Sequence, residues 1–155
     1  INIFDEKIDV ELSYNDNQDG TVTVIAKSKN NKFKNTKPTW KLSEDGYTYT
    51  KIYDSNQNYS TLFTNEYGNT TRKNININKF DEKIDVELSY NYNKDGTVTV
   101  IARTKNNKFA NTKPTWKLSA DGYTYTKIYN SSQNYSTLFT NKYGNTVNKN
   151  IHITI

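Results

Sequence analysis

The sequence predicts an all-β protein made of two tandem antiparallel β-sandwich domains, residues 1–78 and 79–155. Three observations support this prediction. The segment Phe4–Asn78 is repeated at Phe80–Thr154, with 62 of the 75 aligned positions identical. Apolar and polar residues alternate within each copy with the two-residue period of a strand, and no segment sustains the period of a helix. Three glycines in each copy separate the alternating segments, as turns between strands require.

Each predicted strand follows from the alternation of residues in the first copy. The earliest places Ile8, Val10, Leu12 and Tyr14 on one face and acidic or hydroxyl side chains on the other. Threonine, tyrosine and valine recur in the later segments, and these residues suit a pleated, half-buried surface. Six or seven short strands of this kind are typical of an antiparallel β-sandwich. In order, the segments that we assign are 7–14, 20–26, 38–43, 47–53, 58–64 and 70–77.

Turn residues lie between these segments. Gly20 and Gly46 each follow an aspartate, and an Asp-Gly pair between alternating segments is a strong hairpin signal because glycine tolerates a positive φ. Gly68 and Asn69 come directly before the last strand. Pro38 is expected to begin the third strand, where a missing backbone N–H does least harm.

The core is expected to be aromatic. A domain of about 75 residues buries only about 60% of its unfolded surface, so its stability margin is small. The chain has no cysteine to form a disulfide, but it has 13 tyrosines, 6 phenylalanines and 2 tryptophans. Tyr47, Tyr49 and Tyr53 form a row on one strand face. We assign this row to the core, and the alternative is an outward platform on which sugars stack.

The charge distribution argues against nucleic-acid binding. The net charge of the chain is +5, but residues 1–78 carry ten basic and ten acidic side chains while residues 79–155 carry eleven and six. A basic footprint for nucleic acid would not be confined to one of two near-identical copies. No segment approaches 18 consecutive apolar residues, so we expect no insertion into a membrane.

One loop is rich in lysine and is a candidate contact for an anionic polymer such as teichoic acid or a glycosaminoglycan. The favoured interpretation is a solvated loop between strands. Its basic residues are Lys27, Lys29, Lys32, Lys34, Lys37 and Lys41 in the first copy, and Arg103, Lys105, Lys108, Lys113 and Lys117 in the second.

Both copies contain a similar segment, Trp40–Gly46 or Trp116–Gly122, and a Gly-Asn pair before the last strand, Gly68-Asn69 or Gly144-Asn145. In these residues both copies resemble the bacterial immunoglobulin-like repeats of Gram-positive surface and secreted proteins. The shared pattern is Trp-x-Leu-Ser-x-Asp-Gly, then a strand rich in threonine and tyrosine, then a Gly-Asn turn before a final strand. Tyr67 departs from the pattern, which usually has a small residue there. The resemblance implies an immunoglobulin-like sandwich in an extracellular spacer or adhesive module, and it carries over no catalytic residue. The matching residues are Trp40, Leu42, Ser43, Asp45, Gly46, Gly68 and Asn69, and Trp116, Leu118, Ser119, Asp121, Gly122, Gly144 and Asn145.

Residues with catalytic potential are few. His152 is the only histidine, and the first copy has Asn76 at the equivalent position, so a Ser-His-Asp arrangement could form only once. Asp9 and Glu11 share a strand face roughly 7 Å apart, but a carboxylate pair of a glycosidase needs a cleft for which a domain this small has no room. We therefore expect solvated carboxylates and no enzymatic activity. The other acidic pairs are Asp5 with Glu6, Asp81 with Glu82, and Asp85 with Glu87.

The segments Asn15–Gly20 and Asn91–Gly96 match the beginning of an EF-hand calcium loop. The position that requires a bidentate glutamate is occupied by Ala26 in the first copy and by Ala102 in the second. We therefore expect a hairpin turn in both copies. The alternative is weak calcium binding in the first copy, by Asp16, Asn17 and Asp19.

Lys7 and Asn74 fall in the first and last predicted strands and are the candidates for an isopeptide cross-link. The sequence shows no apolar surroundings that would neutralise the lysine, so we expect no such bond.

Taken together, these features predict a non-catalytic spacer or stalk in a larger secreted or cell-surface bacterial protein. Its partners would be flanking domains of the same polypeptide, with a cell-wall or host glycan as a further possibility, and we expect a monomer without metal or cofactor. The alternatives are a module that binds carbohydrate or a host ligand, and an accessory domain of a cell-wall hydrolase.

Overall fold

The computed structural model describes residues 3–155, which form strands, turns and two single-turn 3₁₀ helices. The chain divides into two compact units between Lys79 and Phe80, one residue beyond the boundary predicted from the sequence. Neither helix in the described residues is long or apolar enough to cross a membrane.

The two units contain the same elements in the same order. In the first unit, η1 (Ile3–Asp5) precedes β1 (Val10–Asp16), β2 (Val22–Ser28), β3 (Lys41–Leu42), β4 (Thr48–Tyr53), β5 (Gln57–Thr64) and β6 (Thr70–Ile77). In the second, η2 (Lys79–Asp81) precedes β7 (Val86–Tyr92), β8 (Val98–Thr104), β9 (Lys117–Leu118), β10 (Thr124–Tyr129), β11 (Gln133–Thr140) and β12 (Thr146–Ile153).

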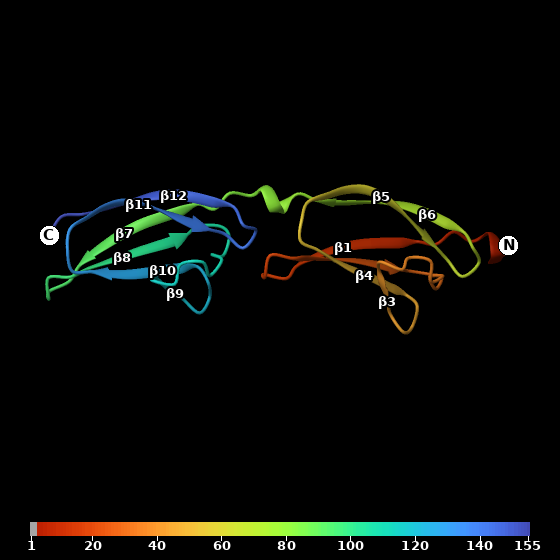
Figure 1. Cartoon of the computed structure of the whole chain (residues 1–155). Helices are drawn as coiled ribbons and strands as arrows, with labels where there is room; N and C mark the ends of the chain where they lie inside the picture. The colour runs from red at the N-terminus through yellow and green to blue at the C-terminus, as the bar shows by residue number, and fades with distance from the viewer. Residues whose placement is uncertain (1–2) are drawn as a thin grey trace. The chain divides into compact units, whose positions relative to one another are not determined.

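Each unit consists of two antiparallel layers. In the first unit a four-stranded sheet of order β1-β2-β4-β3 lies under the two-stranded sheet β5-β6 (Figure 1). The second unit repeats this arrangement with β7-β8-β10-β9 and β11-β12. These paired sheets confirm the prediction of an all-β protein and are consistent with a sandwich in each unit.

The third predicted strand is much shorter than expected, and the first begins and ends later than expected. The strand assigned to 38–43 contains only Lys41 and Leu42, and the expectation that Pro38 begins it is wrong. Pro38 lies in a turn closed by the bond from the Trp40 N–H to the Lys37 carbonyl (3.1 Å). The first strand begins at Val10, because the Asn30 side chain bonds the Asp9 N–H (3.0 Å) and the Lys7 carbonyl in place of a neighbouring strand.

Aromatic side chains fill the space between the layers, as predicted. The ring of Phe33 lies 4.8 Å from that of Tyr49, and the ring of Trp40 lies 5.6 Å from that of Phe63. Tyr49 is 0% exposed, and its hydroxyl donates to the Lys34 carbonyl (3.0 Å). The alternation predicted for β5 is also observed, since Phe63 faces the core while the neighbouring Leu62 faces solvent.

The turn before β4 shows why glycine is required there. Gly46 has a φ of +81°, and a Cβ at this position would meet the side chain of Lys32 at 3.5 Å. The preceding Asp45 carboxylate accepts hydrogen bonds from the Ser43 hydroxyl (2.6 Å) and the Tyr47 N–H (3.1 Å). These bonds, that from Ser43 first, hold the pKa of Asp45 below its usual value.

A buried asparagine joins three distant segments of each unit. Asn65 is 0% exposed, and its amide donates to the Glu6 carbonyl (2.8 Å) and to the Asn31 side-chain oxygen (3.1 Å). Its own side-chain oxygen accepts from the N–H groups of Tyr67 (3.0 Å) and Asn69 (2.9 Å). The side chain therefore ties the N-terminal segment and the loop after β2 to the turn between β5 and β6.

Asn141 makes the equivalent bonds in the second unit, to the Glu82 carbonyl (2.8 Å) and the Asn107 side chain (3.1 Å). Each asparagine uses both amide hydrogens and both acceptor positions. Such saturation is required of a buried polar group, because each unmade bond leaves a desolvated donor or acceptor.

Replacing Asn65 is expected to destabilise the first unit strongly. Asn65→Ala leaves two backbone N–H groups and the buried Asn31 oxygen without partners, so we expect a loss of about 3 kcal/mol in the free energy of unfolding. Chemical denaturation should show a separate, earlier transition for the altered unit. Asn58→Ala, at an exposed position of β5, is the control and should change stability by less than about 0.5 kcal/mol. Equal effects of the two substitutions would contradict this role.

Candidate functional site

A polar groove lies along β5 in the first unit, with a volume of about 450 Å³. A groove of about 560 Å³ lies at the equivalent place in the second unit. Both are open to solvent. The first is lined by Thr36, Lys37, Ser60, Thr61, Leu62, Thr64 and Arg72, and the second by Thr112, Lys113, Ser136, Thr137, Leu138, Thr140 and Asn148.

The groove exists because β5 has a largely uncovered edge. One side of β5 pairs with β6 along its whole length. On the other side the backbone around Phe33 pairs with it, through bonds from the Lys34 N–H to the Thr64 carbonyl (2.9 Å) and from the Glu66 N–H to the Lys32 carbonyl (3.0 Å). After Lys34 the chain turns away toward β3, so no strand of the described part of the chain, residues 3–155, pairs with this edge from Gln57 to Leu62.

Lys37 occupies part of this edge. Its ammonium group donates to the Thr61 hydroxyl and to the Leu62 carbonyl (3.3 Å). The same nitrogen lies 5.4 Å from the ring centre of Trp40 and 4.9 Å from that of Phe63, within cation–π range. Partial burial, with a smaller contribution from the charge of Lys51, lowers the pKa of Lys37 below its ordinary value.

Lys113 repeats these contacts in the second unit, with the Leu138 carbonyl (3.1 Å) and the rings of Trp116 and Phe139. A lysine on an edge strand is a known protection against pairing with the edge of another molecule. The lysine here covers one of the carbonyls that an added strand would use, and it places a charge in the path of that strand.

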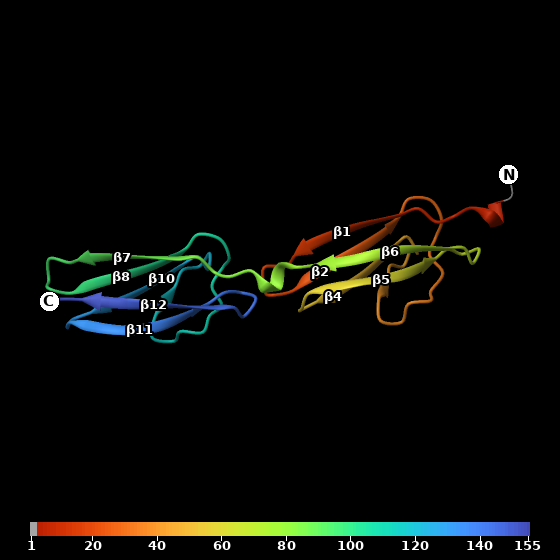
Figure 2. The same ribbon diagram turned by 90° about the horizontal axis from the view of Figure 1, so that it is seen from above.

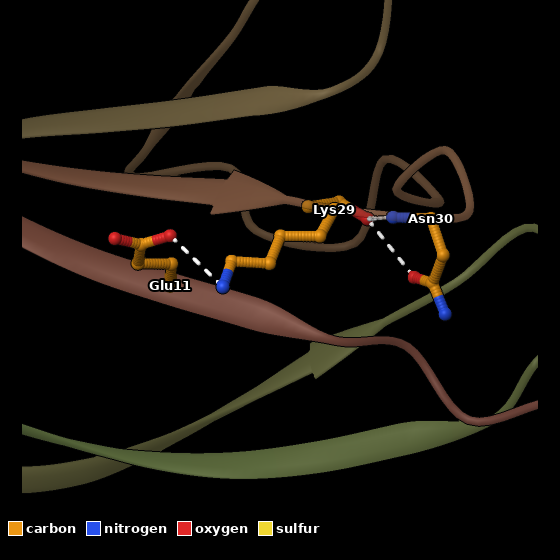
Figure 3. Close-up of polar contacts among 4 residues, drawn as sticks. Glu11, Lys29 and Asn30 are labelled. Carbon is orange, nitrogen blue, oxygen red and sulfur yellow. Dashed lines mark hydrogen bonds and ion pairs between the residues drawn. The ribbon is translucent and has the colours of Figure 1, made fainter.

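The lysine-rich loop, a candidate contact for an anionic polymer, does not present its lysines as one surface. Lys29 pairs with Glu11 on β1 (3.2 Å), as Figure 3 shows, and Lys105 pairs with Glu87 (3.3 Å). Lys32 packs its stem over Gly46. Of the predicted cluster, only Lys37 lines the groove.

The carboxylate and histidine candidates occupy exposed positions. Asp9 and Glu11 are both exposed, and Glu11 is held by its lysine partner. His152 is exposed on β12, where its backbone N–H donates to the Tyr90 hydroxyl (3.3 Å). Lys7 and Asn74 are also exposed, so neither has the apolar surroundings that an isopeptide bond needs. Within residues 3–155, no three His, Cys, Asp or Glu side chains gather at a possible metal site.

The segment that resembles a calcium loop is a hairpin turn. The Asn17 amide donates to the hydroxyls of Thr21 (3.0 Å) and Thr23 (2.8 Å), and the Asp19 carboxylate accepts from the N–H of Thr21 (3.0 Å). Strand β2 begins at Val22, where a calcium loop would have to continue. The side chains proposed as ligands therefore serve the turn.

Two of the three tyrosines in the predicted row, Tyr49 and Tyr53, are in the core, so the row does not form an outward platform for sugars. Tyr53 is 8% exposed and its hydroxyl bonds that of Tyr59, while Trp40 is 6% exposed. Burial, followed by the bond to Tyr59, raises the pKa of Tyr53 above its ordinary value, and Tyr129 shows the same direction beside Tyr135. The interpretation of this row as core is confirmed for Tyr49 and Tyr53, whereas Tyr47 is half-buried and lies in the bend before β4.

Sequence reasoning missed most of the groove and the buried asparagine. The available signal was the segment "QNYSTLFTN", which is identical in both copies and whose alternation assigns Ser60, Leu62 and Thr64 to the outer face. That β5 is an edge strand depends on the order of strands in the sheet, which alternation does not encode.

Comparisons of the chain with protein-family models, curated protein sequences and solved structures found no match. Proposals about function therefore depend on the residues and geometry described above.

Removing the edge lysines is expected to cause self-association. Lys37→Ala together with Lys113→Ala frees a carbonyl on each edge and removes the charge beside it, so sedimentation velocity should show association that increases with concentration. Lost cation–π contacts and hydrogen bonds should also lower the free energy of unfolding by about 1–2 kcal/mol per unit. Lys27→Ala with Arg103→Ala removes the same number of charges from exposed positions of the interior strands β2 and β8 and should stay monomeric. If both double variants behave alike, the lysines do not protect the edge.

The buried tyrosine pairs predict alkaline sensitivity. A raised pKa in the folded state leaves stability complete below the unfolded pKa of about 10, and stability falls as pH rises from there toward the folded pKa. Tyr53→Phe with Tyr129→Phe should therefore make unfolding free energy less dependent on pH above about 10, while costing about 1 kcal/mol per unit at neutral pH. Denaturant titrations across this pH range measure both effects. An unchanged slope in the double variant would refute the assignment.

Proposed function

We propose that the chain is a non-catalytic spacer, formed by two immunoglobulin-like β-sandwich units of a secreted or cell-surface bacterial protein. Its role is to hold flanking domains of the same polypeptide apart. The observation that carries this proposal is a set of hydrogen bonds in each unit. They link the N-terminal part of the unit to the last strand and the turn before it. The experiment below tests this directly.

In the first unit, β1 and β6 run in the same direction, and the chain leaves at the end opposite its beginning (Figure 2). Near the beginning, the Asn69 amide donates to the carbonyls of Phe4 (2.7 Å) and Glu6 (2.8 Å). Near the other end, the Asn76 N–H donates to the Tyr14 hydroxyl (3.2 Å). Tension between the two ends would slide β1 past β6, so these links would be loaded in shear rather than opened one at a time.

The second unit has the same links. Asn145 donates to the carbonyls of Phe80 (2.8 Å) and Glu82 (2.8 Å), and the His152 N–H donates to the Tyr90 hydroxyl (3.3 Å). The same hydrogen bonds between the N-terminal part and the last strand occur in both units. This repetition favours a mechanical role, since every unit of a spacer experiences the same tension.

The residues that carry the resemblance to bacterial immunoglobulin-like repeats all have structural positions here. Trp40 is in the core, while Ser43, Asp45 and Gly46 build the turn before β4. Asn69 holds the N-terminal segment. This distribution supports a module whose shared residues maintain a fold and not an active site.

Single-molecule pulling on the chain tests the proposal. We expect two separate unfolding events, each lengthening the chain by roughly 250 Å, since each unit holds about 75 residues of up to about 3.5 Å. Asn69→Ala should lower the force of one event, and Asn69→Ala with Asn145→Ala should lower both. Asn58→Ala is the control and should leave both forces unchanged. Gradual extension without distinct events would exclude a spacer that keeps its length under tension.

A further inference from the structure

We propose that the groove along β5 in the first unit binds phosphate or sulfate esters carried on a polyol or glycan chain. This site is independent of the spacer role. The equivalent groove in the second unit is a weakened copy of it.

The lining of the groove matches this chemistry. Lys37 and Arg72 supply two positive charges, and the side chains of Thr36, Ser60, Thr61 and Thr64 supply hydroxyls. No carboxylate is among the lining residues. A guanidinium group can hold two oxygens of a phosphate or sulfate at once, and hydroxyl groups can both donate to such oxygens and bond the hydroxyls of a polyol.

The two cations lie on either side of Leu62. Arg72 is its partner across the β5-β6 ladder, and the Lys37 ammonium group bonds its carbonyl on the opposite edge. Within residues 3–155, neither cation forms an ion pair with a carboxylate. Both charges therefore remain available to an external anion.

The surroundings of Lys37 strengthen its attraction for an anion. Its ammonium group is partly desolvated against Trp40 and Phe63, and charge interactions are stronger where water is partly excluded. The two hydrogen bonds that hold this ammonium group on β5 also fix the direction in which it can donate to an anion. The groove is open along the strand, which suits a segment of a chain better than an enclosed small molecule.

The second unit differs at the positions that matter. Asn148 replaces Arg72, and Ala110 replaces Lys34, whose backbone N–H bonds the carbonyl of Thr64 beside the groove. Lys113 is retained. The second groove thus keeps one lining cation, Lys113, and lacks equivalents of Arg72 and of the nearby Lys34.

The net charge of the units and the charge of their grooves predict opposite orders of affinity for anions. Residues 1–78 carry ten basic and ten acidic side chains, whereas residues 79–155 carry a net charge of +5. If anions were attracted only by net charge, the second unit would bind them better. If the groove is the site, the first unit binds them better. A comparison of the two units within the natural chain therefore distinguishes binding at the groove from attraction by net charge.

The test is an NMR titration of the whole chain with three probes: inorganic phosphate, a glycerol-phosphate oligomer and a sulfated heparin oligosaccharide. Uncharged dextran is the control ligand. We expect shifts of the backbone amides of Ser60–Thr64 and Arg72 with the two polymeric anions, and an affinity at least about tenfold lower at the second groove. Whichever polymer binds more tightly identifies the source of the ester.

Matched variants separate the groove from general charge. Arg72→Asn should reduce the affinity of the first groove about tenfold, to that of the second, and Asn148→Arg should raise the second by a similar factor. Lys27→Asn removes the same charge from the exposed face of β2 and should leave both grooves unchanged. Spectra of the free variants establish that each remains folded.

Three results would overturn the proposal. The first is tighter binding by the second unit. The second is a set of shifts spread over the lysines of both units and unaffected by Arg72→Asn, which would indicate general charge attraction only. The third is no response to the anionic polymers together with shifts at Ser60–Thr64 on adding an uncharged extended peptide, which would make the edge a site for strand addition.

Discussion

The fold of each unit depends on one buried amide side chain. Asn65 and its equivalent Asn141 are enclosed and fully hydrogen-bonded, and each joins segments that are 59 and 34 residues away in the sequence. An apolar side chain could fill the same space but could not satisfy the backbone groups that converge on it. The small two-stranded sheet is thereby fixed to both the beginning of the chain and the loop after β2. The hydrogen bonds of this asparagine thus help to hold the two-stranded sheet in place over the four-stranded sheet.

The uncovered edge of β5 is a consequence of how few strands each unit has. With only two strands in one layer, at least one long edge must remain open, and an open edge invites association. Lys37 and Lys113 protect this edge, because each aliphatic stem packs on aromatic rings while the charged end bonds an edge carbonyl. The same placement produces a groove lined by cations and hydroxyls. Protection of the edge and a capacity to bind anions thus have a common physical origin.

The near-identity of the two copies makes their differences informative. The core, the turns and the buried asparagine are the same in both, as two units under the same mechanical demand require. Arg72 and Lys34 have no charged equivalents in the second copy, although that copy is the more basic of the two. A spacer that also attaches weakly to an anionic polymer would need only one such groove. The proposed site and the proposed spacer role are therefore compatible within one chain.

The sequence by itself determined the all-β class, the repeat, most strand positions and the assignment of Tyr49 and Tyr53 to the core. These properties are local, since alternation, turn residues and composition all act within a few residues of each other. The length of β3, the open edge of β5, the division of the lysine loop and the role of Asn65 were decided only by the tertiary structure. Each of them depends on which distant segments become neighbours, as when Lys29 meets Glu11 and Lys37 meets Leu62. A periodic pattern specifies which face of a strand is buried, but not which strand or loop lies beside it.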